Sequence, residues 1–97
     1  MNKQDVLNKL TDSMREIRQS FSVKSLAIFG STARNKADKN SDVDMLVVFN
    51  QKASFDLFMD LKFYLEDLLG TKVDLVTDKA LRPQIRRAIE QELINVP

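Results

Sequence analysis

The sequence contains neither cysteine nor histidine. The missing cysteines exclude disulfide bonds and thiolate nucleophiles, and the missing histidines exclude imidazole bases. The commonest ligands of zinc sites are absent for the same reason. Any chemistry that the chain performs must therefore depend on carboxylates, hydroxyls, lysine and arginine.

Long hydrophobic runs and a strong charge of one sign are also missing. No apolar run approaches the roughly 20 residues that a membrane span needs, and the polar start over residues 1–5 leads into no signal-like apolar segment. We therefore expect no membrane association and a cytoplasmic location. The 15 basic and 14 acidic residues leave a formal net charge of +1. That balance lacks the strong positive field of a duplex-binding protein, so it argues against nucleic acid as a partner.

The size and composition of the chain are those of one folded unit. It has 97 residues, of which 43% are hydrophobic and 30% are charged. A chain of this length has room for one hydrophobic core, and this balance is unlike that of disordered segments. No repeat, linker or low-complexity segment divides it, so we expect a single domain over residues 1–97.

Hydrophobic periodicity predicts four helices. Two are long, one over residues 3–20 and one over 54–69, and the second starts at a capping serine and ends before a glycine. A short helical turn followed by a loop is expected within residues 31–41. The last helix is expected to begin at Pro83, because the fixed φ of proline suits a first turn. The residues that it should direct inward are Ile85, Ala88, Ile89 and Leu93.

Short apolar runs predict three strands, at residues 25–30, 43–49 and 72–76. A helix joins the second strand to the third, so we expect these two to be parallel with a right-handed crossover. The predicted fold class is therefore α/β (α+β), a small mixed three-stranded sheet flanked by helices. The predicted order of elements is α-β-α-β-α-β-α.

Two aspartates, Asp44 and Asp74, interrupt the predicted apolar strands, and a third, Asp42, directly precedes one of them. Asp42 and Asp44 are two positions apart, so on a strand their carboxylates would point to one face, with Cα atoms about 6.5 to 7 Å apart. Asp74 stands between two apolar residues in the next strand, where it can join that pair. Such a group of like charges calls for a cation, and oxygen ligands suit Mg²⁺. Two metal ions about 3.5 to 4 Å apart can clamp an in-line phosphoryl displacement.

Gly30 and Ser31 follow the first strand and offer a second part of such a site. A residue without a side chain lets the backbone and a hydroxyl approach a triphosphate closely, and the turn that follows can direct N–H groups at anionic oxygens. Each of these features can also have a purely structural role. Gly-Ser is a common turn dipeptide, Asp42 can cap a turn after Ser41, and Asp44 or Asp74 can sit at a sheet edge or in a buried ion pair.

Taken together, the motif resembles that of the minimal nucleotidyltransferase domains of the DNA-polymerase-beta-like superfamily. Their pattern is Gly-Ser, ten residues, Asp-x-Asp, and a third acid framed by apolar residues on a later strand. Here it reads Gly30-Ser31, Asp42-Val43-Asp44 and Val73-Asp74-Leu75, and the order of elements agrees along the whole chain. The resemblance implies that Asp42, Asp44 and Asp74 are catalytic and hold two Mg²⁺ ions. It also implies that Asp74 helps to activate the acceptor hydroxyl, and that Gly30 and Ser31 bind the β- and γ-phosphates.

Two basic features lie outside this set. Arg34 matches a frequent basic position of the family, but Asn35 stands where many relatives have glycine, which leaves the path of the loop and the role of Arg34 open. The second feature is a cluster near the start of the last helix. It can bind phosphate or an acidic partner, but pairing with nearby glutamates on a solvated face is favoured, because cations at a helix N-terminus oppose the dipole. The cluster is Arg82, Arg86 and Arg87, and the glutamates are Glu90 and Glu92.

The resemblance also implies a function. Among minimal relatives, the chain looks most like the antitoxin of a two-gene module whose partner is a helical HEPN ribonuclease toxin. It would then move AMP from ATP to a tyrosine of that toxin, releasing pyrophosphate, and the two proteins would form a hetero-oligomer. Two alternatives stay open: a non-catalytic binding module that neutralises a partner by contact, and a nucleotidyltransferase with a small-molecule or RNA acceptor.

Overall fold

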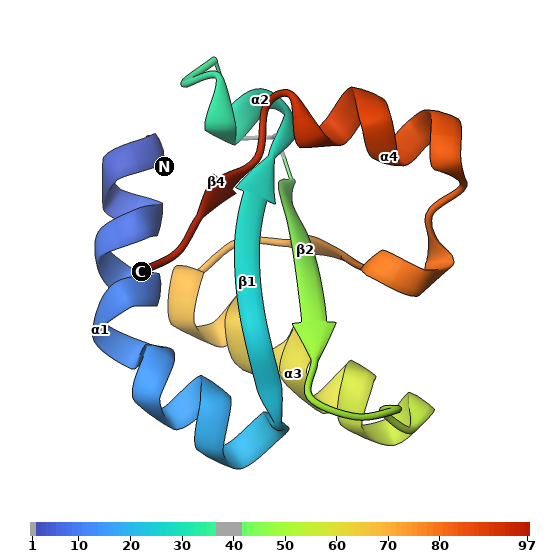
Figure 1. Ribbon diagram of the computed structural model, residues 1–97. Coiled ribbons are helices and arrows are strands. Elements are labelled where there is room, and N and C mark those ends of the chain that lie inside the picture. The colour runs from blue at the N-terminus through green and yellow to red at the C-terminus, as the bar shows by residue number, and fades with distance from the viewer. Residues whose placement is uncertain (1, 37–41) are drawn as a thin grey trace.

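The computed structural model describes residues 2–36 and 42–97, and the described residues form one mixed sheet with helices around it (Figure 1). The helices are α1 (Lys3–Phe21), α2 (Gly30–Ala33), α3 (Phe55–Leu69) and α4 (Pro83–Glu90), with a 3-10 turn η1 (Asp78–Ala80). The strands are β1 (Val23–Phe29), β2 (Val43–Phe49), β3 (Val73–Thr77) and β4 (Ile94–Asn95). The predicted loop at residues 37–41 lies outside the described residues.

The sheet has the strand order β3-β2-β1-β4. β1 is antiparallel to both of its neighbours, β2 and β4, and β2 is parallel to β3. The parallel pair is joined through α3, as the sequence predicted, because two parallel strands need a crossover connection. The α/β fold class with a mixed sheet is therefore confirmed.

The predicted number of strands was wrong, because β4 adds a fourth strand at the edge of the sheet. The last helix ends at Glu90, and the chain then returns so that Ile94 pairs with Ile28 and Asn95 with Ala27. The N–H of Val96 also donates to the carbonyl of Leu26, at 2.9 Å. A strand of two residues is too short to show a period-2 pattern. Its pairing depends on β1, far away in the sequence.

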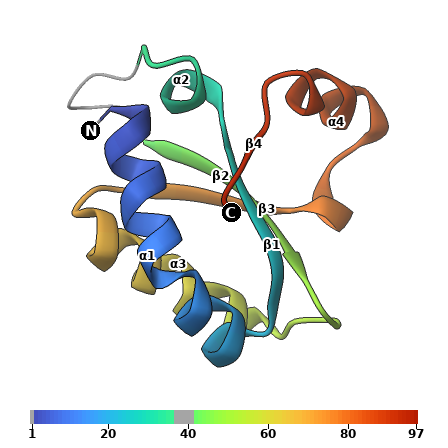
Figure 2. The same cartoon turned by 60° about the vertical axis from the view of Figure 1, so that its left-hand side comes forward.

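The ends of the long helices follow the predicted local rules. The Ser54 side chain caps α3 by accepting a hydrogen bond from the N–H of Leu57 at 3.1 Å. Gly70 ends that helix with φ +69°, a left-handed conformation that glycine adopts readily. Figure 2 shows α1 and α3 side by side on one face of the sheet. These two helices therefore cover one face of the sheet and leave its opposite face uncovered.

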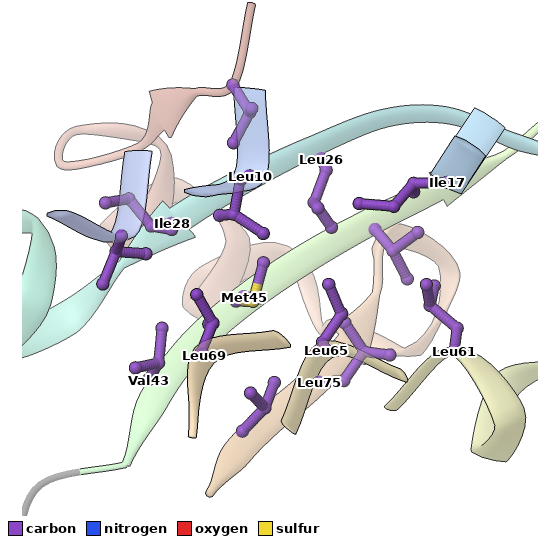
Figure 3. Packing of buried hydrophobic residues seen from close by; sticks show 14 of the residues in the cluster. Leu10, Ile17, Leu26, Ile28, Val43, Met45, Leu61, Leu65, Leu69 and Leu75 are labelled. Carbon is purple, nitrogen blue, oxygen red and sulfur yellow. The ribbon is translucent and has the colours of Figure 1, made fainter. Parts of the chain in front are cut away.

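The main hydrophobic core lies between α1, α3 and the sheet (Figure 3). In β2, Val43, Met45 and Val47 are buried in this core. Side chains alternate along a strand, so Asp44 and Leu46 point to the opposite face. The other fully buried members are mainly leucine and isoleucine: Leu10, Ile17, Leu26, Ile28, Leu61 and Leu65.

The last helix packs differently from the prediction. α4 begins at Pro83 as expected, but Ile85 is 51% exposed and Ala88 is exposed as well. Ile89 is buried, at 8% exposure, whereas Leu93 is only partly buried and lies beyond the helix end. The predicted inward stripe was thus wrong for Ile85 and Ala88, because a helix of two turns reaches the body of the protein through only one of its apolar residues. No helix among the described residues is long and apolar enough to cross a membrane.

Candidate active site

Two carboxylates meet where β2 and β3 begin. The register of the parallel pair sets Asp44 directly beside Asp74. Both residues alternate with core residues, so both point to the sheet face that α1 and α3 leave uncovered. Asp74 is exposed and Asp44 is partly buried. The register thus brings together two of the residues that the sequence predicted for the site.

The surroundings of Asp44 disfavour its charged form. Burial raises the pKa of the Asp44 carboxyl above its ordinary value of 3.8, and the neighbouring Asp74 raises it further through its charge and a hydrogen bond. The charges of Asp42 and Glu92 act in the same direction. A partly buried carboxyl beside another acid holds its charge at a cost that a bound cation would reduce.

Gly30 lies on the other side of Asp44. The register of β1 and β2 pairs Phe29 with Asp44, and the chain then turns into α2 with Gly30 at φ +71°. A Cβ added to Gly30 would overlap the Asp44 carboxylate. Both the backbone conformation and the close approach therefore require glycine here. Ser31, the next residue, is partly buried in the short helix.

Asp42 is exposed and lies immediately before β2. Within residues 2–36 and 42–97, no group of three or more acidic side chains is gathered closely enough to hold a metal ion by itself. The structure thus brings Asp44 and Asp74 together, with Asp42 close enough to affect the Asp44 pKa. The assignment of all three to one metal site stays a prediction. The donor set nevertheless fits a divalent cation, because it consists of carboxylate oxygens that repel one another.

Glu92 contacts the same turn, and the sequence did not predict it. One carboxylate oxygen of Glu92 accepts a hydrogen bond from the N–H of Gly30 at 3.1 Å. The other lies 2.6 Å from a guanidinium nitrogen of Arg34. Glu92 was expected to pair with the arginines of α4 instead, and that expectation was wrong. The only sequence signal was an acid near the end of the chain, and its distant partners come from the fold.

The loop that carries Arg34 is held in place by its neighbour Asn35. Asn35 adopts φ +58°, a left-handed conformation in which asparagine is one of the few side chains commonly found. Its side-chain oxygen accepts a hydrogen bond from the N–H of Lys3 at 3.2 Å, which ties the turn to the start of α1. Asparagine therefore suits this left-handed position, and Arg34 is placed against Glu92.

The arginines near the start of α4 are solvent-exposed. Arg86 forms an ion pair with Glu90 one turn along the helix, at 3.0 Å, as the solvated-face interpretation predicted. Such exposed pairs contribute little to stability. Arg82 and Arg87 are exposed too, and we leave all three out of the candidate site.

A mixed sheet that sets two aspartates beside the turn at Gly30 agrees with the resemblance to nucleotidyltransferases that the sequence indicated. Comparison with known proteins agrees with this class. Residues 7–96 match the nucleotidyltransferase domain family. The chain is 38% identical over 93 residues to the protein adenylyltransferase MntA of Thermococcus cleftensis, covering 96% of this chain and 94% of that protein. The chain therefore belongs to the nucleotidyltransferase domain family, and over nearly its whole length it is similar to MntA.

Solved structures share this fold. A protein provisionally assigned as a minimal nucleotidyltransferase superposes with a TM-score of 0.83 at 31% identity, over 97% of this chain and 95% of that one. An MNT antitoxin, solved in complex with a tri-AMPylated HEPN toxin of Shewanella oneidensis, has a TM-score of 0.71 at 18% identity. That match covers 98% of this chain and 71% of the other. At this identity the second likeness shows the fold alone.

Proposed function

We propose that this nucleotidyltransferase moves AMP from ATP to a tyrosine hydroxyl of a helical HEPN-type partner and so acts as its antitoxin. The observation that carries the chemistry is the contact of Asp44 with Asp74 on neighbouring parallel strands. Two carboxylates on an otherwise apolar pair of strands are unfavourable for folding alone. They are useful where cationic charge must be held beside a triphosphate.

In this proposal Asp42, Asp44 and Asp74 hold two Mg²⁺ ions. The ions supply charge neutralisation for the triphosphate and for the leaving pyrophosphate. The raised pKa of Asp44 supports this assignment, because burial and the charge of Asp74 both disfavour the ionised carboxylate, and a cation would offset both. Asp42 and Asp74 are exposed and Asp44 is partly buried, so solvent can deliver ions to the site without opening the core.

The chain's own residues have separate tasks in the transfer. Gly30 and Ser31 bind the β- and γ-phosphates, with the backbone of Gly30 free of a side chain where it passes Asp44. The acceptor oxygen forms a bond to the α-phosphorus, and the bond from that phosphorus to the bridging oxygen breaks, so pyrophosphate leaves with the electron pair. Asp74 accepts the proton of the acceptor hydroxyl. Positioning and electrostatic stabilisation provide most of the rate enhancement in such reactions.

The partner assignment is supported by the relatives and by the openness of the site. The relative from Thermococcus cleftensis is named a protein adenylyltransferase, and an MNT antitoxin of this fold was solved with an AMPylated HEPN toxin. In this chain Asp74 is exposed, on the sheet face that the two long helices do not cover. A tyrosine on the surface of another protein can therefore reach it.

The test uses ATP labelled at one phosphate at a time. The chain is incubated with Mg²⁺ and a HEPN-type protein encoded beside it, and the protein is then digested to locate the label. Transfer of AMP leaves label from α-labelled ATP on a tyrosine and none from γ-labelled ATP, whereas a kinase gives the reverse. Asp44→Asn should abolish the signal.

Each alternative function predicts a different outcome of this experiment. If Asp44→Asn still neutralises the toxin at equal concentration, protection comes from contact and the chain acts as a binding module. If α-label goes to RNA or a small alcohol and not to the protein, the reaction class holds but the antitoxin role fails. If no acceptor is labelled by the wild-type chain, the proposed transfer is wrong.

A further inference from the structure

The carboxylate of Glu92 contacts both ends of the turn formed by residues 30–34, which we call the glycine turn. α2 begins at Gly30 and is followed directly by Arg34, and Glu92 contacts both. One oxygen accepts from the Gly30 N–H at 3.1 Å, and the other accepts from Arg34 at 2.6 Å. Glu92 therefore spans the turn that the proposed function assigns to the phosphates.

The edge strand β4 brings Glu92 to this place. The pairing of Ile94 with Ile28 and of Asn95 with Ala27 aligns the end of the chain along β1, two residues before Gly30. Glu92 lies two residues before Ile94 and thus reaches the end of β1. Figure 1 shows α2 and α4 at this same end of the molecule. The contact spans 62 residues of sequence and depends on the sheet.

The carboxylate of Glu92 suits this position because its two oxygens accept from two different groups, the Gly30 N–H and the Arg34 guanidinium. The side chains of Arg34 and Glu92 are 52% and 30% exposed, so the ion pair itself adds little stability. The pair connects the end of the chain to Arg34, which directly follows α2.

We propose that Glu92 is a positioning residue that holds Gly30 and Arg34 in the arrangement that receives the triphosphate. It acts through these two groups and does not contact the reacting atoms. The proposal rests on the proposed function in one respect, that a nucleotide binds at this turn. It adds a residue from the end of the chain to a site otherwise built from the first three strands.

The first experiment tests the geometry without any turnover. The chain has only two glycines, so selective ¹⁵N-glycine labelling gives an amide spectrum with two resonances. Gly70 is the internal control, because its N–H donates to the carbonyl of Glu66 at 2.8 Å, away from Glu92. In Glu92→Ala, the Gly30 amide should shift and exchange with solvent at least about tenfold faster, while Gly70 stays unchanged. An unchanged Gly30 amide would overturn the proposal.

The second experiment measures nucleotide use with the matched variant Glu92→Gln. Glutamine keeps an acceptor for the Gly30 N–H but loses the ion pair with Arg34. We expect the KM for ATP to rise about tenfold in Glu92→Ala and less in Glu92→Gln, with kcat within about threefold, because acceptor activation by Asp74 is untouched. Arg34→Ala combined with Glu92→Ala should be little worse than either alone, since the two act as one unit.

Two of the remaining outcomes decide against the proposal, and a third separates it from the proposed function. A lower melting temperature with unchanged KM and kcat means that Glu92 only fastens β4. A lower KM in Glu92→Ala means that the carboxylate competes with the phosphates for the turn. If the wild-type chain transfers no nucleotide, the proposed function fails, but addition of Mg·ATP still reports on the turn. A shift of Gly30 in the wild type that is lost in Glu92→Ala then keeps the positioning role.

Discussion

At the scale of single residues, the two glycines show how one backbone conformation can serve two purposes. Gly30 and Gly70 have nearly the same positive φ, +71° and +69°. At Gly70 a Cβ would meet open space, and at Gly30 it would overlap the carboxylate of Asp44. Gly70 therefore serves only the end of a helix, whereas Gly30 also gives the site its shape.

This pair gives a prediction with a built-in control. Gly70→Ala should lower the free energy of unfolding by roughly 1 to 2 kcal/mol, the cost of a left-handed conformation with a Cβ, and leave nucleotide binding unchanged. Gly30→Ala should lower it further and abolish binding of Mg·ATP, because the methyl group displaces Asp44. Urea unfolding and calorimetry measure both effects. Equal losses of stability with intact binding in both variants would show that Gly30 is only a turn residue.

Asp44 predicts a specific pH dependence of stability. Its pKa is raised in the folded protein, so above the ordinary value of 3.8 the folded state binds more protons than the unfolded state. In chelator, the contribution of Asp44 to the free energy of unfolding should therefore fall as the pH rises above about 4 and through its folded pKa. Asp44→Asn removes this pH-dependent contribution. The variant should therefore exceed the wild type in free energy of unfolding by an amount that grows from pH 4 to pH 7. A variant that is less stable at pH 7 would place Asp44 in a structural ion pair.

At the scale of elements, α4 shows where a helical pattern misleads. Ile85, Ala88 and Ile89 have the spacing of an inward stripe, but the helix spans only eight residues and Ile89 is its one buried side chain. An apolar pattern states which residues can share a face. It does not state how much of that face the rest of the protein covers.

The two isoleucines of α4 test this difference directly. Ile89→Ala removes a side chain that is 8% exposed and should lower the free energy of unfolding by about 2 kcal/mol or more. Ile85→Ala removes one that is 51% exposed and should change it by about 0.5 kcal/mol or less. Chemical denaturation of the two variants provides the comparison. Equal and large losses would mean that α4 packs more tightly in solution.

At the scale of the whole molecule, the proposed acidic site would link ligand binding to folding. Asp44 and Asp74 lie on neighbouring strands, so a cation bound between them would connect the edge strand β3 to the inner strand β2. Any ligand that binds only the folded state raises its stability by mass action. A protein that carries unfavourable acids without its ligand should gain from this effect.

We therefore predict that Mg²⁺ with a non-hydrolysable ATP analogue stabilises the wild-type chain. At a ligand concentration about 100 times its Kd, the gain should be about 2.7 kcal/mol. The double variant Asp44→Asn with Asp74→Asn should show no gain, and chelator should abolish it in the wild type. Thermal melts with and without metal measure this. Equal stabilisation by the nucleotide with chelator present would remove the aspartates from the binding site.

Much of the fold follows from local sequence. The hydrophobic patterns of α1, α3 and β2 extend over enough residues to identify each element. Ser54 marks the start of α3 by capping it with a hydrogen bond, and Gly70 marks its end by adopting a left-handed conformation. The aspartates could be singled out because charge within an apolar strand has few structural roles. β1 and β3 were placed correctly to within two residues at each end.

The sequence by itself determined which residues are chemically able to form the site, because residue type and strand alternation are local properties. Tertiary structure decided which of them meet. The register of β2 against β3 set Asp44 beside Asp74, and the antiparallel pairing of β1 with β2 set Gly30 against Asp44. The edge pairing of β4 brought Glu92 to the glycine turn. Contacts between distant segments depend on loop closure and sheet pairing, and no short stretch of sequence encodes them.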